Sequence, residues 1–228
     1  MRWLLTSLLL SAAFPIQAAE DEAEKLFRAM EQKVKAAKTL RVRYELDISA
    51  AADKKGTVKG AILLGEGDQY RLDGEGKIFG QQVKFTTVCD GARVSEVVEP
   101  PPPQSETNPP RQPKGSGAFL RAALPPLGFF LTSLFMDRRD TWEPPTVSDF
   151  KLVGNEKVGG RAAKVIQFTV TAKGGDGTAF KLWLDAETNL PAKLAMTGGE
   201  SDIKAVTETY AEFAVDVKVE AKSFAVAK

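Results

Sequence analysis

Histidine is absent from this 228-residue sequence, and its absence bears directly on function. Histidine is the usual general base, the usual partner of serine and cysteine nucleophiles, and the commonest protein ligand of transition metals. Catalysis without it would have to rely on paired carboxylates or on lysine. We therefore expect a protein that is not an enzyme and that uses no metal and no cofactor.

The acidic residues do not change this expectation. A hydrolase would have to use the carboxylates Asp73, Glu75, Asp90, Asp185 and Glu187. All of them lie in or beside predicted turns, where solvated Asp and Glu are common, and no spacing pairs them as an acid and a base. Asp176, in a Gly-Gly-Asp-Gly segment, lacks the spaced acidic ligands of a calcium-binding loop.

Cysteine is nearly absent as well, since Cys89 is the single one in the sequence. One cysteine excludes any intrachain disulfide, whatever the redox compartment. Cys89 ends the apolar run VKFTTVC and precedes Asp90-Gly91. We interpret it as a small buried hydrophobic residue.

The N-terminal segment has the pattern of a signal peptide. Arg2 precedes an apolar run that ends at Phe14, and the small residues Ala18 and Ala19 precede two acidic residues. The run of about a dozen residues is shorter than the roughly 20 that cross a membrane. We expect residues 1–18 to be cleaved and residues 19–228 to form a single periplasmic domain. With no cysteine near the cleavage site, we expect no lipid anchor.

Charge is balanced in the expected mature chain. The 31 basic residues less Arg2 equal the 30 acidic residues, so no basic footprint indicates a nucleic-acid partner. About 210 residues remain after cleavage, which is enough to bury a sizeable core.

Apolar periodicity predicts one helix followed by many strands. From Asp21 to about Leu40 the apolar residues recur at steps of three and four, which is typical of an amphipathic helix. The period then changes to two. We expect strands over Leu40–Ile48, Thr57–Leu64, Gln69–Asp73, Ile78–Cys89, Arg93–Val98, Phe150–Val153, Ala163–Thr171, Ala179–Asp185, Ala192–Met196 and Ala205–Phe213. Predicted turns include 65–68, 73–76 and Asp90-Gly91. The fold class is therefore α+β, with a large curved antiparallel sheet.

Two unusual segments separate the two groups of strands. Residues 99–117 are rich in proline, and we expect an exposed, extended loop. Residues 118–136 are the most apolar stretch of the mature chain, but Arg121 and the pair Pro125-Pro126 would break a membrane-spanning helix. We predict two short helical pieces that meet at the proline pair.

The segment KLWLDAETNLPAKLAM, residues 181–196, raises the question of what covers the sheet. Side chains alternate along a strand, so Leu182 and Leu184 face one way and Trp183 faces the other. We expect the core to cover one face and a helix, lid or ligand to cover the other.

Five local sequences occur in a distinctive order: GDQYRLDG (67–74), VCDGARV (88–94), NEKVGGRAAKVIQF (155–168), LWLDAETNLP (182–191) and TETYAEF (207–213). With the order of the predicted elements, they resemble the LolA/LolB-type lipoprotein-carrier superfamily. The resemblance implies an incomplete, half-open barrel whose apolar concave face is closed by an N-terminal helix and a central helical lid. It also implies a lid-holding arginine before the QYRLD-like segment, where residues 64–68 here contain no basic residue.

Our first functional hypothesis is a carrier that binds a lipid, an acyl chain or a lipidated peptide on the concave face. The expected ligand-lining residues are Val42, Tyr44, Leu46, Ile62, Leu64, Val83, Phe85, Leu120, Leu124, Phe129, Phe130 and Leu134. Such a protein would be a monomer that contacts a membrane transiently. The alternative is an exported interaction or envelope-sensing scaffold that acts through protein contacts without a small ligand. An exposed apolar patch over residues 118–136 would favour the scaffold, and a cavity beneath them would favour the carrier.

Overall fold

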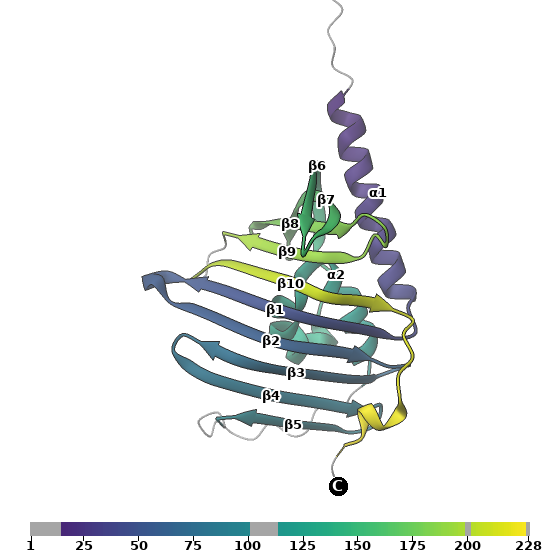
Figure 1. Cartoon of the computed structure of the whole chain (residues 1–228), viewed down its shortest axis with the longest axis vertical. Helices are drawn as coiled ribbons and strands as arrows, with labels where there is room; N and C mark the ends of the chain where they lie inside the picture. Colours follow the sequence, from purple (N-terminus) through teal and green to yellow (C-terminus); the bar gives the residue numbers. More distant parts are fainter. Residues whose placement is uncertain (1–14, 101–113, 199–201, 227–228) are drawn as a thin grey trace, which may run out of the picture.

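Ten antiparallel strands form one open sheet in the part of the chain that the computed structural model describes, residues 15–100, 114–198 and 202–226. Two long helices accompany this curved sheet, and one of them lies behind β10 to β3 in the view of Figure 1. The expected class is confirmed: an α+β fold with a large curved antiparallel sheet, an N-terminal helix and a central apolar helix. The residues before 15 in the predicted signal peptide, and 101–113 of the proline-rich segment, lie outside the described residues.

The elements follow the predicted order closely. The helices are α1 (Pro15–Ala36) and α2 (Ser116–Phe135), with short 3₁₀ turns η1 (Ala51–Asp53), η2 (Met136–Thr141) and η3 (Ala221–Phe224). The strands are β1 (Leu40–Ala50), β2 (Lys55–Leu64), β3 (Gln69–Ile78), β4 (Gln81–Asp90), β5 (Val94–Glu99), β6 (Thr146–Val158), β7 (Arg161–Thr171), β8 (Gly177–Asp185), β9 (Pro191–Thr197) and β10 (Ile203–Val215). No helix among the described residues is long and apolar enough to cross a membrane.

The sheet consists of two meanders joined at one seam. Its strand order is β5-β4-β3-β2-β1-β10-β9-β8-β7-β6, so β1 pairs with β10 and the edges are β5 and β6. The chain leaves the first meander at one edge and enters the second at the other edge. The segment that contains α2 therefore has to cross from one edge of the sheet to the other.

The inner face of the sheet, which we define as the face that packs against the helices, carries the main core. Burial alternates strictly along β1, because the apolar residues Val42, Tyr44, Leu46 and Ile48 point inward. A buried stripe on α1, including Phe27 and Met30, packs against the same core. The expected helix is confirmed in its buried stripe, but it ends at Ala36 and Leu40 already belongs to β1.

The β8–β9 hairpin fastens α1 to the sheet. Asp185 Oδ1 accepts hydrogen bonds from the backbone N–H groups of Glu187 and Thr188 and from the Thr188 hydroxyl, which orders the turn. Asn189 then donates from its side chain to the carbonyl oxygen of Leu26 on α1 at 3.2 Å. The Asp-x-x-Thr-Asn segment thus positions a helix as well as ending a strand.

The turn that we predicted at residues 73–76 is wrong. These residues lie inside β3, and the hairpin turns instead at Phe79-Gly80, where φ is 51° and 92°. Two central residues with positive φ match the right-handed twist of the flanking strands. Gly74 is needed in the strand because the ring of Phe85 occupies the place where its Cβ would lie. The glycines therefore reflect close packing rather than chain reversal.

A small cluster on the outer face of the sheet covers Trp183, so our expectation of a helix, lid or ligand there is corrected. Trp183 is 5% exposed and packs with Val158, Ala163, Val165 and Ala192. Its Nε1–H donates to Glu156 at 2.7 Å, and the Nζ atoms of Lys181 and Lys193 each lie 4.6 Å from the ring centroid. Side chains of the sheet itself cover the ring.

Candidate functional site

The apolar helix α2 covers the inner face of the sheet. Phe119, Leu120, Ala123, Leu124 and Leu127 are buried in the main core, and the helix also packs against α1, β3 and β10. In Figure 1 it runs behind the central strands. The expected helical lid is therefore present, and its apolar face is buried against the sheet.

α2 is broken at Gly128, not at Pro125-Pro126 as predicted. Gly128 has φ 68° and ψ 178°, whereas both prolines lie within the helical turn before it. A Cβ at Gly128 would lie 2.7 Å from Leu194 Cδ2 and 2.9 Å from Glu208 Cδ, so glycine is required at this contact. The break is set by a neighbour on β10 rather than by the local proline signal.

Glu208 on β10 caps the second half of α2. Its carboxylate accepts hydrogen bonds from the backbone N–H groups of Phe129 at 2.7 Å and Phe130 at 2.6 Å, and from the Tyr210 hydroxyl at 2.7 Å. The helix N-terminus favours such a negative charge. Glu208 is only 2% exposed, and this burial raises the pKa of its carboxyl, although the three hydrogen bonds oppose the shift. Burial and the neighbouring Glu208 also raise the pKa of Tyr210.

The start of α2 is fastened to the loop between β2 and β3. Asp68 accepts hydrogen bonds at 3.0 Å from the backbone N–H groups of Gly115 and Gly117. Arg121 donates to the carbonyl oxygens of Lys38 at 2.8 Å and Gly65 at 2.5 Å. The arginine that the resemblance led us to expect near residues 64–68 is absent from that stretch, but Arg121 reaches the stretch from the helix.

A cavity of about 630 Å³ lies between the second half of α2, η2 and the strands β7 to β9. Leu127, Leu131, Val170, Phe180 and Met196 contribute its apolar wall. The remaining lining residues are Arg138, Thr141, Trp142, Glu143, Pro145, Ala172, Lys173, Asp176, Thr178 and Gly198. Its volume lies within the roughly 300–1,000 Å³ of small-molecule sites.

A second void, of about 10 Å³, lies deeper under α2. It shares Leu127, Leu131, Phe180 and Met196 with the larger cavity and is also bordered by the carboxylate-bearing residue Glu208. The apolar wall of the cavity therefore continues toward the break in α2.

The structure gathers the predicted ligand-lining residues into one core but does not place them around this cavity. Val42, Tyr44, Leu46, Ile62, Leu64, Leu120, Leu124 and Phe129 are buried there, while Val83, Phe85 and Phe130 are partly buried against them. The rings of Tyr44 and Phe129 lie 4.4 Å apart between centroids, which fills the space between β1 and α2. The Leu134 side chain lies outside the described residues. Their role in binding stays a prediction.

Sequence reasoning missed the residues that do line the cavity. Val170 and Phe180 had a usable signal, because the period of two places them on the same faces as Phe168 and Leu182 in the predicted strands. No sequence pattern indicated Trp142 or Arg138, since they follow α2 in an irregular segment whose position depends on the fold.

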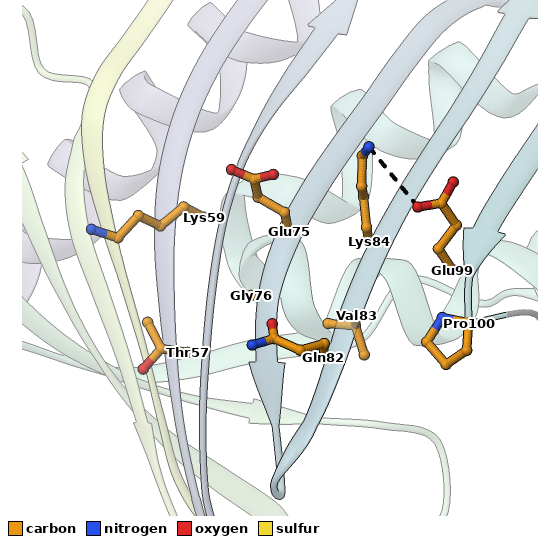
Figure 2. Close-up of a pocket in the computed structure, with 9 residues that line it drawn as sticks. All are labelled: Thr57, Lys59, Glu75, Gly76, Gln82, Val83, Lys84, Glu99 and Pro100. Atoms are coloured by element: carbon orange, nitrogen blue, oxygen red, sulfur yellow. Dashed lines mark ion pairs between the residues drawn. The ribbon is translucent and has the colours of Figure 1, made fainter.

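A further hollow of about 530 Å³ lies on the outer face of the sheet near β5. Figure 2 shows its lining: Thr57, Lys59, Glu75, Gly76, Gln82, Val83, Lys84, Glu99 and Pro100. Lys59, Glu75, Lys84 and Glu99 stand opposite one another on neighbouring strands with alternating charge. Lys84 and Glu99 form an ion pair at 4.0 Å. Cross-strand charge pairs of this kind are typical of a solvated sheet face and need no ligand.

Three of the five carboxylates that a hydrolase would need, Asp73, Asp90 and Asp185, have structural partners. Asp73 is held by Arg71 at 2.6 Å and by Thr86 at 2.9 Å, and Asp90 accepts from the backbone N–H groups of Ala92 and Arg93 in a turn. These turn hydrogen bonds lower the pKa of Asp90. Among the described residues, no group of three or more His, Cys, Asp or Glu side chains is placed to hold a metal.

Comparison with known proteins gives structural matches at low sequence identity. No family model and no curated protein matches the sequence. The lipoprotein LppX of Mycobacterium tuberculosis matches with a TM-score of 0.50 and 12% identity over 88% of this chain and 100% of its own. LprF of Mycobacterium bovis matches with a TM-score of 0.51 and 13% identity over 88% of this chain and 96% of its own. A LolA superfamily protein of Nitrosomonas europaea matches with a TM-score of 0.31 and 9% identity, over 90% of this chain and 97% of its own. The chain therefore shares its overall fold with LppX and LprF.

Proposed function

We propose that this protein is a non-enzymatic periplasmic carrier that holds an apolar ligand in the cavity between α2 and β7–β9. In this proposal residues 1–18 are removed on export and residues 19–228 form one domain. The observation that carries it is the apolar cavity of about 630 Å³ at the place where the helical lid meets the sheet. The fold that this chain shares with the lipoprotein LppX supports an envelope role.

Burial of apolar surface favours ligand binding beside the second half of α2. A ligand that covers the walls formed by Leu131, Phe180 and Met196 removes apolar surface from water, at about 25 cal/mol per Å². Toward β1 the side chains already fill the inner face, as the contact between Tyr44 and Phe129 shows. A longer ligand would reach the predicted lining residues there only by displacing side chains of α2.

The arrangement of residues 118–136 supports a carrier over a protein-binding scaffold. A scaffold would present this apolar segment as an exposed patch. Here Phe119, Leu120 and Leu124 are buried against the sheet, and the cavity opens beside Leu131. The described apolar side chains of the segment are thus largely buried within the molecule.

Native mass spectrometry of the protein purified from its exported compartment, with organic extraction, tests the proposal. We expect a bound lipid or acyl species in defined stoichiometry, and uptake of a fluorescent fatty acid by the emptied protein. Leu131→Trp should narrow the cavity next to α2 and reduce uptake at least about tenfold. Val97→Trp is the matched control, because Val97 is 54% exposed on the edge strand β5 and does not border the cavity.

Two results would contradict the proposal. One is a wild-type chain that carries no ligand and takes up no probe. The other is probe binding that Leu131→Trp leaves unchanged, which would place the binding site elsewhere on the molecule.

A further inference from the structure

We infer that the ligand is an amphiphile with an acidic head group, carboxylate or phosphate, which Arg138 binds at the mouth of the cavity while the apolar part lies along Leu131 and Phe180. This inference rests on the proposed function, because it names the class of ligand for the same cavity.

The charges on the cavity lining leave Arg138 available. Lys173 and Glu143 neutralise each other through an ion pair at 2.9 Å. Arg138 is exposed on η2, and no acidic partner of its side chain occurs in the described part of the chain. Its neighbour Arg139 has a different position, since its side chain is 8% exposed and donates to the Met136 carbonyl oxygen at 3.3 Å. One arginine is thus built into the fold, and the other is presented at the rim.

The chemistry of arginine determines which head group fits. A guanidinium offers a planar fork of N–H donors that matches a carboxylate or a phosphate in a bidentate geometry. An alcohol or an ester head group would accept hydrogen bonds without the charge. An acidic head group therefore gains most from Arg138.

The small void beneath the cavity favours one orientation of such a ligand. The void beneath the cavity is bordered by Glu208, whose buried carboxylate already accepts three hydrogen bonds. An acidic head group placed there would find no hydrogen-bond donor to spare, because the three donors around the void already bond to Glu208. The apolar end is therefore the end that points inward, and the acidic end stays at the mouth.

Asp176 is the one lining residue that works against this arrangement. It lies in the β7–β8 turn, is exposed, and borders the same cavity as Arg138. Its carboxylate lowers the attraction of the rim for an anion. Removing this charge should therefore strengthen the binding of an acid and leave a neutral ligand unaffected.

The test compares matched ligands by isothermal titration calorimetry on the full mature chain. Oleate, oleyl alcohol and oleoyl lysophosphatidate share the same chain and differ in the head group. We expect Arg138→Gln to weaken oleate and lysophosphatidate about five- to twentyfold and to leave oleyl alcohol unchanged. Arg138→Lys should restore part of the affinity, and Asp176→Asn should raise it for the acids. Arg43→Gln, on the outer face of β1, is the control for a general loss of positive charge.

The outcomes separate this inference from the proposed function. If all three ligands bind and Arg138→Gln weakens none of them, the head-group inference is wrong while apolar binding stands. If Arg138→Gln weakens all three equally, Arg138 acts on the fold and the inference is again wrong. If the wild-type chain binds none of them, both fail. A larger effect on lysophosphatidate than on oleate supports the inference and assigns a phosphate.

Discussion

Replacing Glu208 by alanine should loosen the second half of α2 and destabilise the whole protein. The change removes the acceptor of three hydrogen bonds, from the backbone N–H groups of Phe129 and Phe130 and from the Tyr210 hydroxyl. Phe129 and Tyr210 are buried, so water cannot easily replace the lost partner, whereas Phe130 is partly exposed.

The expected magnitude follows from the two buried donors. Each buried donor left without an acceptor costs about 1–3 kcal/mol, and a lost helix cap typically costs about 1 kcal/mol. Removing a desolvated carboxylate returns part of this cost. We expect Glu208→Ala to lower the free energy of unfolding by about 2–4 kcal/mol at neutral pH, a large share of the 5–15 kcal/mol of a typical domain.

Urea unfolding followed by circular dichroism measures this loss, and hydrogen exchange of the Phe129 and Phe130 amides localises it. Glu208→Gln is the control, because it keeps the shape of the side chain and one acceptor oxygen, and it should lose less. A loss below 1 kcal/mol for Glu208→Ala, with unchanged exchange at both amides, would refute the idea that this carboxylate caps α2.

The same carboxyl gives the stability of the protein a defined pH dependence. Burial raises the pKa of Glu208 above its ordinary value of 4.5, so between that value and the raised one the folded state holds a proton that the unfolded state has lost. Stability from this group is therefore complete below about pH 4.5 and falls as the pH rises through the raised pKa. The stability difference between wild type and Glu208→Gln should follow this course, and a difference that does not vary with pH would contradict it.

Three further substitutions test the packing described above. Arg121→Ala should cost about 1–2 kcal/mol in urea unfolding, because hydrogen bonds from a charged but partly exposed group to the Lys38 and Gly65 carbonyl oxygens are lost, and an unchanged midpoint would count against it. Gly74→Ala should cost about 1–3 kcal/mol through collision with the Phe85 ring, and the double variant with Phe85→Leu should recover part of that loss. Trp183→Ala should cost about 3–5 kcal/mol in thermal or urea unfolding, whereas a near-neutral effect would show that the outer-face cluster contributes little.

The elements that sequence reasoning predicted correctly are those whose signals are local. The alternation along Leu40–Ile48 and the spacing of the apolar residues on α1 depend only on the period of a strand or a helix. The errors arose where a distant neighbour decides the local structure. Gly74 and Gly76 indicate a turn until the Phe85 ring is seen above one of them.

The errors about the break in α2 and about the position of the cavity also arose because distant residues decide the local structure. The break lies at Gly128 because Glu208, 80 positions along the chain, supplies the cap. A cavity is a place where packing is incomplete, and side chains from α2, η2 and three strands define it jointly. No periodicity within one segment reports such a gap, so the lining residues were predicted for the fully packed part of the same face.

The connection of α2 to opposite edges of the sheet determines how the inner face can open. A helix connected to one edge of the sheet by a single hinge could rotate away from the sheet. In contrast, α2 lies in the segment that joins β5 at one edge to β6 at the other. It behaves as a strap across the sheet, because its start is tied to Asp68 and its middle to Glu208. Such a strap can rise only as far as these two ties allow. In the proposed carrier, the ligand would therefore pass sideways beneath the second half of α2, between the helix and the strands β7 to β9.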